Sequence, residues 1–465
     1  MQKNDCIVAA AEGLGSQGEG IIRTNDCTLF VPYLLPGERA QVRVLKEKNG
    51  IGYGKVEEVL TPAEERVRPR CPVFFRCGGC QLQHMRYRAQ LKFKTAQVEA
   101  ALHKIGGTHV RVKPCEKSEK DYAYRNKLQL PVGRQNGENV IGFYAERSHR
   151  IVPTTVCPIH PDWAEKVIAA LHSFMEKCGL DGYDEETGEG QIRHIVVREL
   201  KDKYIVTLVT TVRSLKGIDF FLFLLDQIFP DYSLLLNVNT RRTNVVFGEE
   251  FVLVKGPAFY ECTEAGIAFE AGANTFVQVN AGVRAKLYEH IVSLFEEGER
   301  VIDCYSGGGL LTAMLARKCA AAYGIELIEE AVACANRLKE RNDLQARMTN
   351  ICGKVEEELD ALLAKGKYSV VLDPPRSGVE RSVLKALIAR KVDKIVMVSC
   401  NPATLARDVG ILTGSLVETE KGELKKSENP RTMYEVSLVQ PYDMFPQTRH
   451  VETLVLLSRK EEMLP

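Results

Sequence analysis

The sequence contains no long apolar run. Its longest block of large hydrophobic residues, FFLFLL at 220–225, ends at Asp226, whereas a membrane-spanning helix needs about 20 apolar residues. The first residues, MQKNDCIVAAAEGLG, lack the basic segment and the apolar block of a signal peptide. Repeats and low-complexity segments are also absent, so we expect ordinary globular domains with no membrane association.

Strong net charge is absent too, because 62 Lys and Arg nearly balance 61 Asp and Glu. The two signs are unevenly distributed: residues 61–130 hold 15 basic and 6 acidic residues, an excess of +9, which leaves −8 for the rest of the chain. A basic block of this kind is typical of polyanion binding. It is also typical of a solvated surface, and charge alone leaves both interpretations open.

Three regions differ in their sequence pattern, and 465 residues are enough for several domains. Residues 1–61 show short alternating strands with turns at LLPGE and KNG, which predicts a small β-barrel. Residues 62–270 contain an amphipathic helix over 87–105 and two predicted hairpins, one turning at NGEN, which indicates a β-rich central domain. The helix is a candidate to pack on the third domain.

Strands and helices alternate in the third region, 271–465. This pattern predicts a Rossmann-like, doubly wound α/β sheet that binds ligands at the carboxyl ends of its strands. In VIDCYSGGG, a strand leads into Gly307, Gly308 and Gly309, and Glu326 ends the next strand about 20 residues later. Such a pair suits an adenosine ligand or a dinucleotide, although the loop is not G-x-G-x-x-G and a plain turn is the alternative.

Two further residues follow predicted strands of this sheet. Asp373 opens DPPRSG, where Arg376 occupies the position that an aromatic residue takes in amino-group methyltransferases, which argues against methylation of adenine's amino group. Cys400 follows an apolar strand and precedes Asn401-Pro402. It is either a nucleophile facing the cofactor crevice or a buried small hydrophobe.

Fourteen cysteines in a chain with no sign of secretion imply a reducing compartment, and we expect a cytoplasmic protein. Cys71, Cys77 and Cys80 form C-x5-C-x2-C, and Cys157 is a candidate fourth ligand because it follows a predicted hairpin that can return to the group. Four thiolates suit zinc or an iron–sulfur cluster equally well, and unliganded thiols are the third possibility.

In order along the chain, CPVFFRCGGCQLQH, FVQVN, DCYSGGG, LDPPRSG, SCNPATLARD and DMFPQTRHVET resemble the motifs of the uracil-5 RNA methyltransferases. The resemblance spans nearly the whole chain and is strongest to the 23S ribosomal RNA branch. It implies a class I methyltransferase domain, an N-terminal TRAM domain of the oligonucleotide-binding type, and S-adenosylmethionine as methyl donor.

The resemblance also assigns roles to residues. It makes Cys400 the thiolate that adds to carbon 6 of uracil, and Glu452 the base that removes the proton from carbon 5. Without the family, Glu452 would pass for a surface glutamate. Cofactor contacts carry over to four positions: Gln278, Tyr305, Glu326 and Asp373. Two positions depart from the family pattern. Leu310 stands where Asn is common, and Cys352-Gly353 stands where Asn or Asp near the adenine is common.

For the cysteines, the resemblance implies a 4Fe-4S cluster held by Cys71, Cys77, Cys80 and Cys157. Uracil methylation transfers no electron, so the expected role is structural: the cluster would hold the basic segment as an RNA-binding surface. Phe74, Phe75 and Tyr87 in this region either stack on bases or belong to the core.

The expected activity is therefore formation of 5-methyluridine in 23S rRNA. The same chemistry on tRNA is one alternative, and a non-catalytic RNA-binding or assembly factor is another. No obligate protein partner is evident, and the polar stretch 418–437 has no assigned function.

Overall fold

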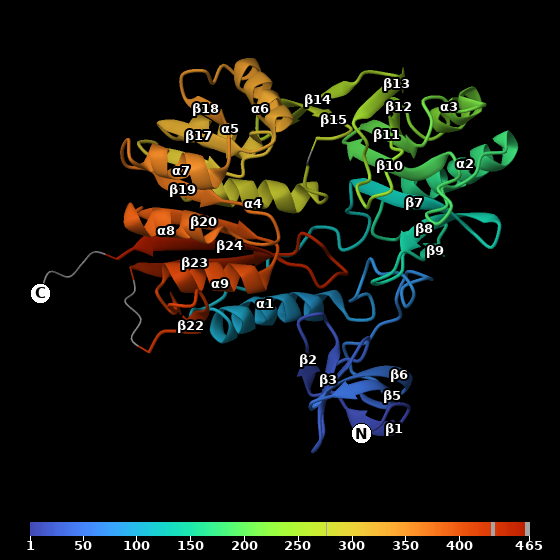
Figure 1. Cartoon of the computed structure of the whole chain (residues 1–465), viewed down its shortest axis with the longest axis horizontal. Coiled ribbons are helices and arrows are strands. Elements are labelled where there is room, and N and C mark those ends of the chain that lie inside the picture. Colours follow the sequence, from blue (N-terminus) through green and yellow to red (C-terminus); the bar gives the residue numbers. More distant parts are fainter. Residues whose placement is uncertain (276, 429–432, 461–465) are drawn as a thin grey trace, which may run out of the picture. The chain divides into compact units, whose positions relative to one another are not determined.

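The computed structural model of the protein describes residues 1–275, 277–428 and 433–460. The chain forms two compact units (Figure 1). The first consists of Met1–Phe93, Lys120–Pro257 and Phe445–Arg449, and the second of Lys94–Glu119, Ala258–Met444 and His450–Pro465. Within the described residues, no helix combines the length and the apolar content that crossing a bilayer requires.

The N-terminal sheet of the first unit has a small apolar core of its own. Along β5, buried Ala40, Val42 and Val44 alternate with more exposed residues, as expected for a strand with one face on a core. The strand order is β1-β5-β6-β4-β3-β2, with β1 Cys6–Ala10, β2 Gly13–Leu14, β3 Gly20–Arg23, β4 Thr28–Val31, β5 Arg39–Lys48 and β6 Ile51–Thr61. The short strands predicted over 1–61 are confirmed.

A second, seven-stranded sheet completes the first unit. Its order is β13-β12-β11-β10-β7-β8-β9, with β7 Lys127–Gln135, β8 Glu138–Tyr144, β9 Ile151–Pro153, β10 Ile192–Leu200, β11 Lys203–Thr210, β12 Tyr232–Val238 and β13 Glu250–Lys255. Helices α2 (Trp163–Cys178) and α3 (Ile218–Asp226) cover its core. Both predicted hairpins are confirmed, and the β7–β8 turn uses Asn136 and Gly137 at positive φ, 54° and 83°.

The main sheet of the second unit places its strands in the order β18-β17-β16-β19-β20-β24-β23. Five neighbouring strands run parallel, and β24 is antiparallel to both of its neighbours. The bounds are β16 Arg300–Cys304, β17 Ala321–Glu326, β18 Met348–Cys352, β19 Ser369–Leu372, β20 Lys394–Ser399, β23 Tyr434–Tyr442 and β24 Glu452–Arg459. Strands such as β19, SVVL, are buried throughout, because helices cover a parallel sheet on both faces.

Two sets of helices pack among themselves, α4 to α6 and α7 to α9, and right-handed crossovers place the two sets on opposite faces of the sheet. They span α4 Ala281–Ser293, α5 Leu310–Lys318, α6 Glu329–Arg341, α7 Val355–Leu363, α8 Arg381–Ala389 and α9 Pro402–Leu412. Two hairpins, β14 Phe259–Glu264 with β15 Ile267–Gly272 and β21 Leu416–Glu418 with β22 Leu424–Lys426, complete the unit. The predicted Rossmann-like sheet is confirmed.

The predicted helix over 87–105 is confirmed as α1, Tyr87–Lys104. It begins in the first unit and belongs to the second from Lys94 onward. There Lys94 forms a fully buried ion pair with Asp443. Removing one partner of a buried ion pair strongly destabilises the folded protein. This contact therefore holds α1 against the main sheet of the second unit.

Candidate active site

A glycine loop follows β16 and opens α5. Tyr305, Gly307 and Gly309 all have positive φ, at 65°, 54° and 80°, and Gly309 has no room for a side chain because a Cβ there would lie 2.7 Å from that of Ala335. The Gly307 N–H donates a 2.9 Å hydrogen bond to Glu326 Oε2 at the end of β17. The predicted loop and its acidic partner therefore meet, as the glycine fingerprint of nucleotide-binding sheets requires.

Two aspartates lie at the point where the strand order reverses, between β16 and β19. Asp303 is buried in β16 and accepts a 2.6 Å hydrogen bond from Thr312 Oγ1, and burial raises its pKa to about 7. Asp373 follows β19, and its N–H reaches Cys304 O at 3.4 Å. Ligands of doubly wound sheets bind at this reversal, so Asp373 stands where a cofactor contact is expected.

The two predicted catalytic residues meet across an antiparallel strand pair. Ser399 of β20 is the register partner of Thr453 of β24. One step further in each strand direction places Cys400 opposite Glu452, on the same side of the pair. The two residues are 52 positions apart in the sequence, and only the antiparallel pairing brings them together.

The charges of these groups act on one another. Burial raises the pKa of Cys400, and the carboxylates of Glu452 and Asp373 raise it further, whereas the Arg376 guanidinium lowers it by charge and by a hydrogen bond. Burial also raises the pKa of Glu452 well above its ordinary value, and Asp373 adds to the rise. The structure thus groups a thiol, two carboxylates and a guanidinium.

Arg376 is the member of this group to which the sequence assigned no role at the site. Its backbone carbonyl accepts hydrogen bonds from Asn401 Nδ2 at 3.1 Å and Thr404 Oγ1 at 3.4 Å. The loop after β19 is thereby fixed to the start of α9, beside Cys400. The rigid Pro-Pro pair before Arg376 was the available signal, because it constrains where the arginine points.

Replacing Arg376 with alanine should slow iodoacetamide alkylation of Cys400 about tenfold near neutral pH, since a hydrogen bond to a charged group contributes about 1.5 kcal/mol or more. The curve of rate against pH should move to higher pH, because the guanidinium favours the thiolate. Mass spectrometry of the Cys400 peptide gives the rate. Arg390→Ala, which removes an exposed pair with Asp360, is the control, and equal rates in both variants would contradict the role.

One predicted cofactor contact and the two positions that depart from the family pattern remain to be placed. Gln278 is partly buried and lies two residues before Asn280, whose side chain caps α4. Cys352 is exposed at the end of β18, where it is the register partner of Glu326. Leu310 is the first residue of α5. Residues 429–432 of the polar stretch lie outside the described residues.

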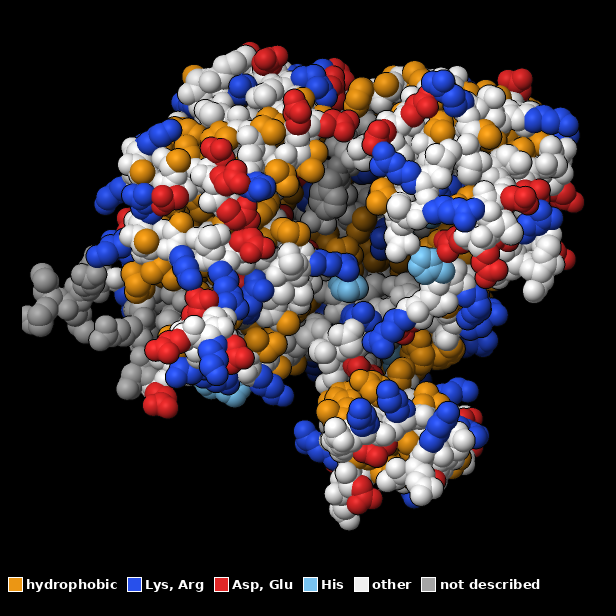
Figure 2. All heavy atoms as spheres, in the orientation of Figure 1, with side chains coloured by type: hydrophobic (Ala, Val, Ile, Leu, Met, Phe, Trp, Pro, Cys, Tyr) orange, Lys and Arg blue, Asp and Glu red, His pale blue; other side chains and the backbone are white. Residues whose placement is uncertain are grey.

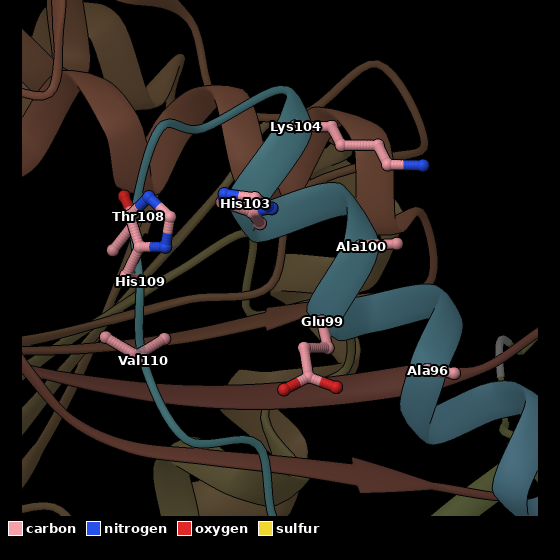
Figure 3. Close-up of a pocket in the computed structure, with 8 residues that line it drawn as sticks. All are labelled: Ala96, Glu99, Ala100, His103, Lys104, Thr108, His109 and Val110. Carbon is pink, nitrogen blue, oxygen red and sulfur yellow. The ribbon is translucent and has the colours of Figure 1, made fainter.

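A separate hollow of about 430 Å³ lies beside the last turns of α1 (Figure 3). His103 and His109 approach each other there, with ring centroids 4.0 Å apart. None of the predicted catalytic or cofactor residues lines it.

The four predicted metal ligands are neighbours within the first unit. Cys80 and Cys157 pack in one apolar cluster and Cys77 in another, Cys71 belongs to both clusters, and none of the four is in a disulfide. Burial raises the pKa of all four, that of Cys80 to about 12 and that of Cys157 furthest, and the other thiols add to the rise in Cys77, Cys80 and Cys157.

Across the described residues, no three His, Cys, Asp or Glu side chains are arranged to hold one metal ion. A 4Fe-4S cluster would instead take four cysteine thiolates as its ligands. Four neighbouring thiols, with the Gly79 N–H donating to Cys77 Sγ at 3.3 Å, fit that donor set in number and kind.

The fold and the site define a class I methyltransferase that uses S-adenosylmethionine. The family model for tRNA (uracil-5-)-methyltransferase matches residues 86–460, and the TRAM domain model matches residues 11–56. The chain belongs to the tRNA (uracil-5-)-methyltransferase family, and the predicted RNA methyltransferase activity is confirmed at that level.

Relatives match over nearly their full length. The chain is 37% identical to an uncharacterized RNA methyltransferase of Halalkalibacterium halodurans, over 99% of this chain and 98% of the relative. It is 36% identical to one of Listeria monocytogenes, over 98% of each. The crystal structure of Pyrococcus abyssi tRNA (uracil-54, C5)-methyltransferase in complex with S-adenosyl-L-homocysteine matches with a TM-score of 0.75 and 27% identity, over 97% of this chain and 99% of that one.

Proposed function

We propose that the protein methylates carbon 5 of a uridine in 23S rRNA through a covalent adduct on Cys400. The observation that carries the covalent step is the position of Cys400 opposite Glu452 on neighbouring strand ends. Carbon 5 of uracil is a poor nucleophile, and addition of a thiolate to carbon 6 converts the ring into an enolate whose carbon 5 can attack a methyl group. S-adenosylmethionine, when bound, supplies that methyl group as an electrophile.

The residues of the site divide the remaining work. Arg376 favours the thiolate of Cys400 and is positioned by Asn401. Glu452 takes the proton from carbon 5 after methylation, the carbon–sulfur bond breaks, and the thiolate leaves the finished base. Glu326 and the glycine loop would hold the adenosine moiety, with Gln278, Tyr305 and Asp373 completing the cofactor contacts.

Domain roles follow from the same proposal: residues 1–61 bind RNA, 62–270 form the cluster-bearing domain, and 271–465 carry the chemistry. On the outer face of the N-terminal sheet, Tyr53 is 49% exposed, its ring lies 6.1 Å from that of Phe30, and Lys46 is its register partner. Basic and apolar side chains share the visible surface of this sheet (Figure 2). Aromatic and basic groups together suit single-stranded RNA. We propose that the protein is located in the cytoplasm, where thiols stay reduced.

A uridine in tRNA is the second candidate substrate, and the full-length similarity to the Pyrococcus abyssi tRNA enzyme favours it. Either base must leave its stack to reach Cys400, so we expect the target in a loop or an unfolded segment. Mapping of 5-methyluridine in 23S rRNA and in tRNA from a deletion strain decides between them. Loss of the modification from tRNA alone would reject the ribosomal target, and loss from neither would reject both.

The four cysteines should hold a 4Fe-4S cluster. Anaerobically purified protein should be brown, with about four iron and four acid-labile sulfide per chain. Cys77→Ser should lower the iron content and the soluble yield of the protein, because it removes one ligand of the proposed cluster. Cys178→Ser, at a partly buried cysteine elsewhere in the same unit, should change neither. One zinc per chain without sulfide would contradict the cluster.

A further inference from the structure

Two neighbouring phenylalanines in the cysteine turn lie in opposite environments. Phe74 is 1% exposed and packs with Cys80 and Tyr124, whereas Phe75 is 59% exposed. Within residues 61–93, all of which the structure describes, Phe75 is the only large hydrophobic side chain that is exposed. Core packing therefore accounts for Phe74 and leaves Phe75 unexplained.

The Phe75 ring is supported from behind. Tyr33 lies edge-on to it with ring centroids 5.1 Å apart, and Phe74 does so at 5.0 Å. The turn that carries it is closed by the N–H groups of Arg76 and Cys77, which both donate to Val73 O at 2.9 Å. A ring held in this way loses little conformational freedom when another flat group stacks on it.

The turn is also held against the rest of the unit. The Gly78 N–H donates to Tyr144 O at 3.0 Å, and a Cβ at Gly78 would lie 2.9 Å from the backbone of Glu146. Only glycine permits this close approach. Phe75 thus stands on a fixed surface between Cys71 and Cys77.

The surroundings of the ring are basic. Arg68, Arg70 and Arg76 are exposed, and the Arg70 guanidinium lies 4.3 Å from the centroid of the Tyr122 ring. Of the acidic groups nearby, Glu146 faces Arg449 at 3.8 Å, and Asp121 lies close enough to Tyr122 to raise its pKa. A single exposed aromatic ring among arginines is unlike a protein interface, which buries a contiguous apolar patch. It matches the combination of stacking and phosphate contacts that holds single-stranded nucleic acid.

We propose that Phe75 is a stacking platform for an unpaired base of the substrate RNA, flanked by phosphate contacts from Arg68, Arg70 and Arg76. The inference rests on the proposed function and adds a recognition element remote in sequence from Cys400. The base that stacks on Phe75 is not the one that is methylated. Its identity is unrestricted, because every base offers a π face.

The test compares Phe75→Ala with Phe223→Ala. Phe223 is also 59% exposed and lies on α3 of the same unit, so it controls for the loss of an exposed ring. With 23S rRNA transcript as substrate, Phe75→Ala should raise KM for RNA about 5- to 100-fold and leave kcat within about twofold. Phe223→Ala should match the wild type. Phe75→Trp should retain tight binding, and Phe75→Leu should behave like the alanine variant because it keeps apolar area without a π face.

A direct readout uses single-stranded RNA oligonucleotides with 2-aminopurine at successive positions. The wild-type protein should change the fluorescence at one position by stacking, and Phe75→Ala should abolish that change. Unchanged RNA affinity in Phe75→Ala, or wild-type affinity in Phe75→Leu, would overturn the proposal; the first result would assign the ring to a protein contact. A wild-type enzyme that forms no 5-methyluridine in 23S rRNA or tRNA would instead reject the proposed function, since binding is measured independently of turnover.

Discussion

Cys400→Ala should bind RNA and S-adenosylmethionine normally and form neither 5-methyluridine nor a covalent complex. In the proposed mechanism the thiolate acts before methyl transfer, because its addition to carbon 6 is the step that makes carbon 5 nucleophilic. The side chain is only partly buried, so its removal should leave the fold intact. Denaturing gel electrophoresis with RNA and methyl-labelled cofactor measures both outcomes, because a covalent complex survives denaturation and a bound one does not.

Cys352→Ala is the matched control, because Cys352 also follows a parallel strand of the same sheet and is exposed. It should retain turnover and the covalent complex. A complex that persists in Cys400→Ala would place the nucleophile elsewhere. Cys304 is a poor candidate for that alternative nucleophile, because it is fully buried and burial raises its pKa far above the ordinary value.

The parallel part of the site followed from the sequence. The strands predicted before the glycine loop, before Asp373 and before Cys400 are β16, β19 and β20. Their polar ends had to meet because parallel strands end at one edge of the sheet. Asp373 and Cys400 are therefore residues that pattern alone could select. The pairing of Glu326 with the glycine loop follows for the same reason.

Glu452 could not be selected in this way. Residue-level reasoning treats it as a surface glutamate, yet it is 2% exposed. Its position depends on β24, which inserts antiparallel between β20 and β23, and long-range antiparallel pairing leaves no local periodicity to identify its partner. Only the family resemblance pointed to it. The sequence did not predict the role of Arg376 at the site for a related reason, because its contact with Cys400 depends on the conformation of a loop rather than on a strand register.

The cysteine group shows the same limit. The short spacing of Cys71, Cys77 and Cys80 was enough to group these three residues in the sequence. The choice of Cys157 depended on a predicted hairpin folding back, and the structure places Cys157 beside the other cysteines. The different fates of Phe74 and Phe75 were also open in the sequence. Adjacent residues of a turn have no period that separates a buried face from an exposed one.

Elimination should depend on pH through Glu452. Burial and the neighbouring Asp373 raise its pKa, so its carboxyl holds a proton at low pH and cannot accept another. The rate of the last step should therefore rise as pH increases toward that raised pKa and level off above it. The free thiol of Cys400 titrates in the same direction, so single-turnover measurements on the preformed adduct are needed to isolate the glutamate.

Glu452→Gln should separate the two halves of the reaction. Glutamine keeps the size and hydrogen-bonding capacity of the side chain but cannot take a proton, so methyl transfer proceeds and elimination stalls. We expect turnover to fall about 10²- to 10⁴-fold, the usual contribution of a general base. On denaturing gels the methyl label should migrate with a protein–RNA complex, whereas the label in Cys400→Ala should not. Glu435→Gln, at an exposed glutamate of β23, should leave no trapped adduct. Normal turnover by Glu452→Gln would remove this residue from the mechanism, and an unmethylated adduct would place its action before methyl transfer rather than after it.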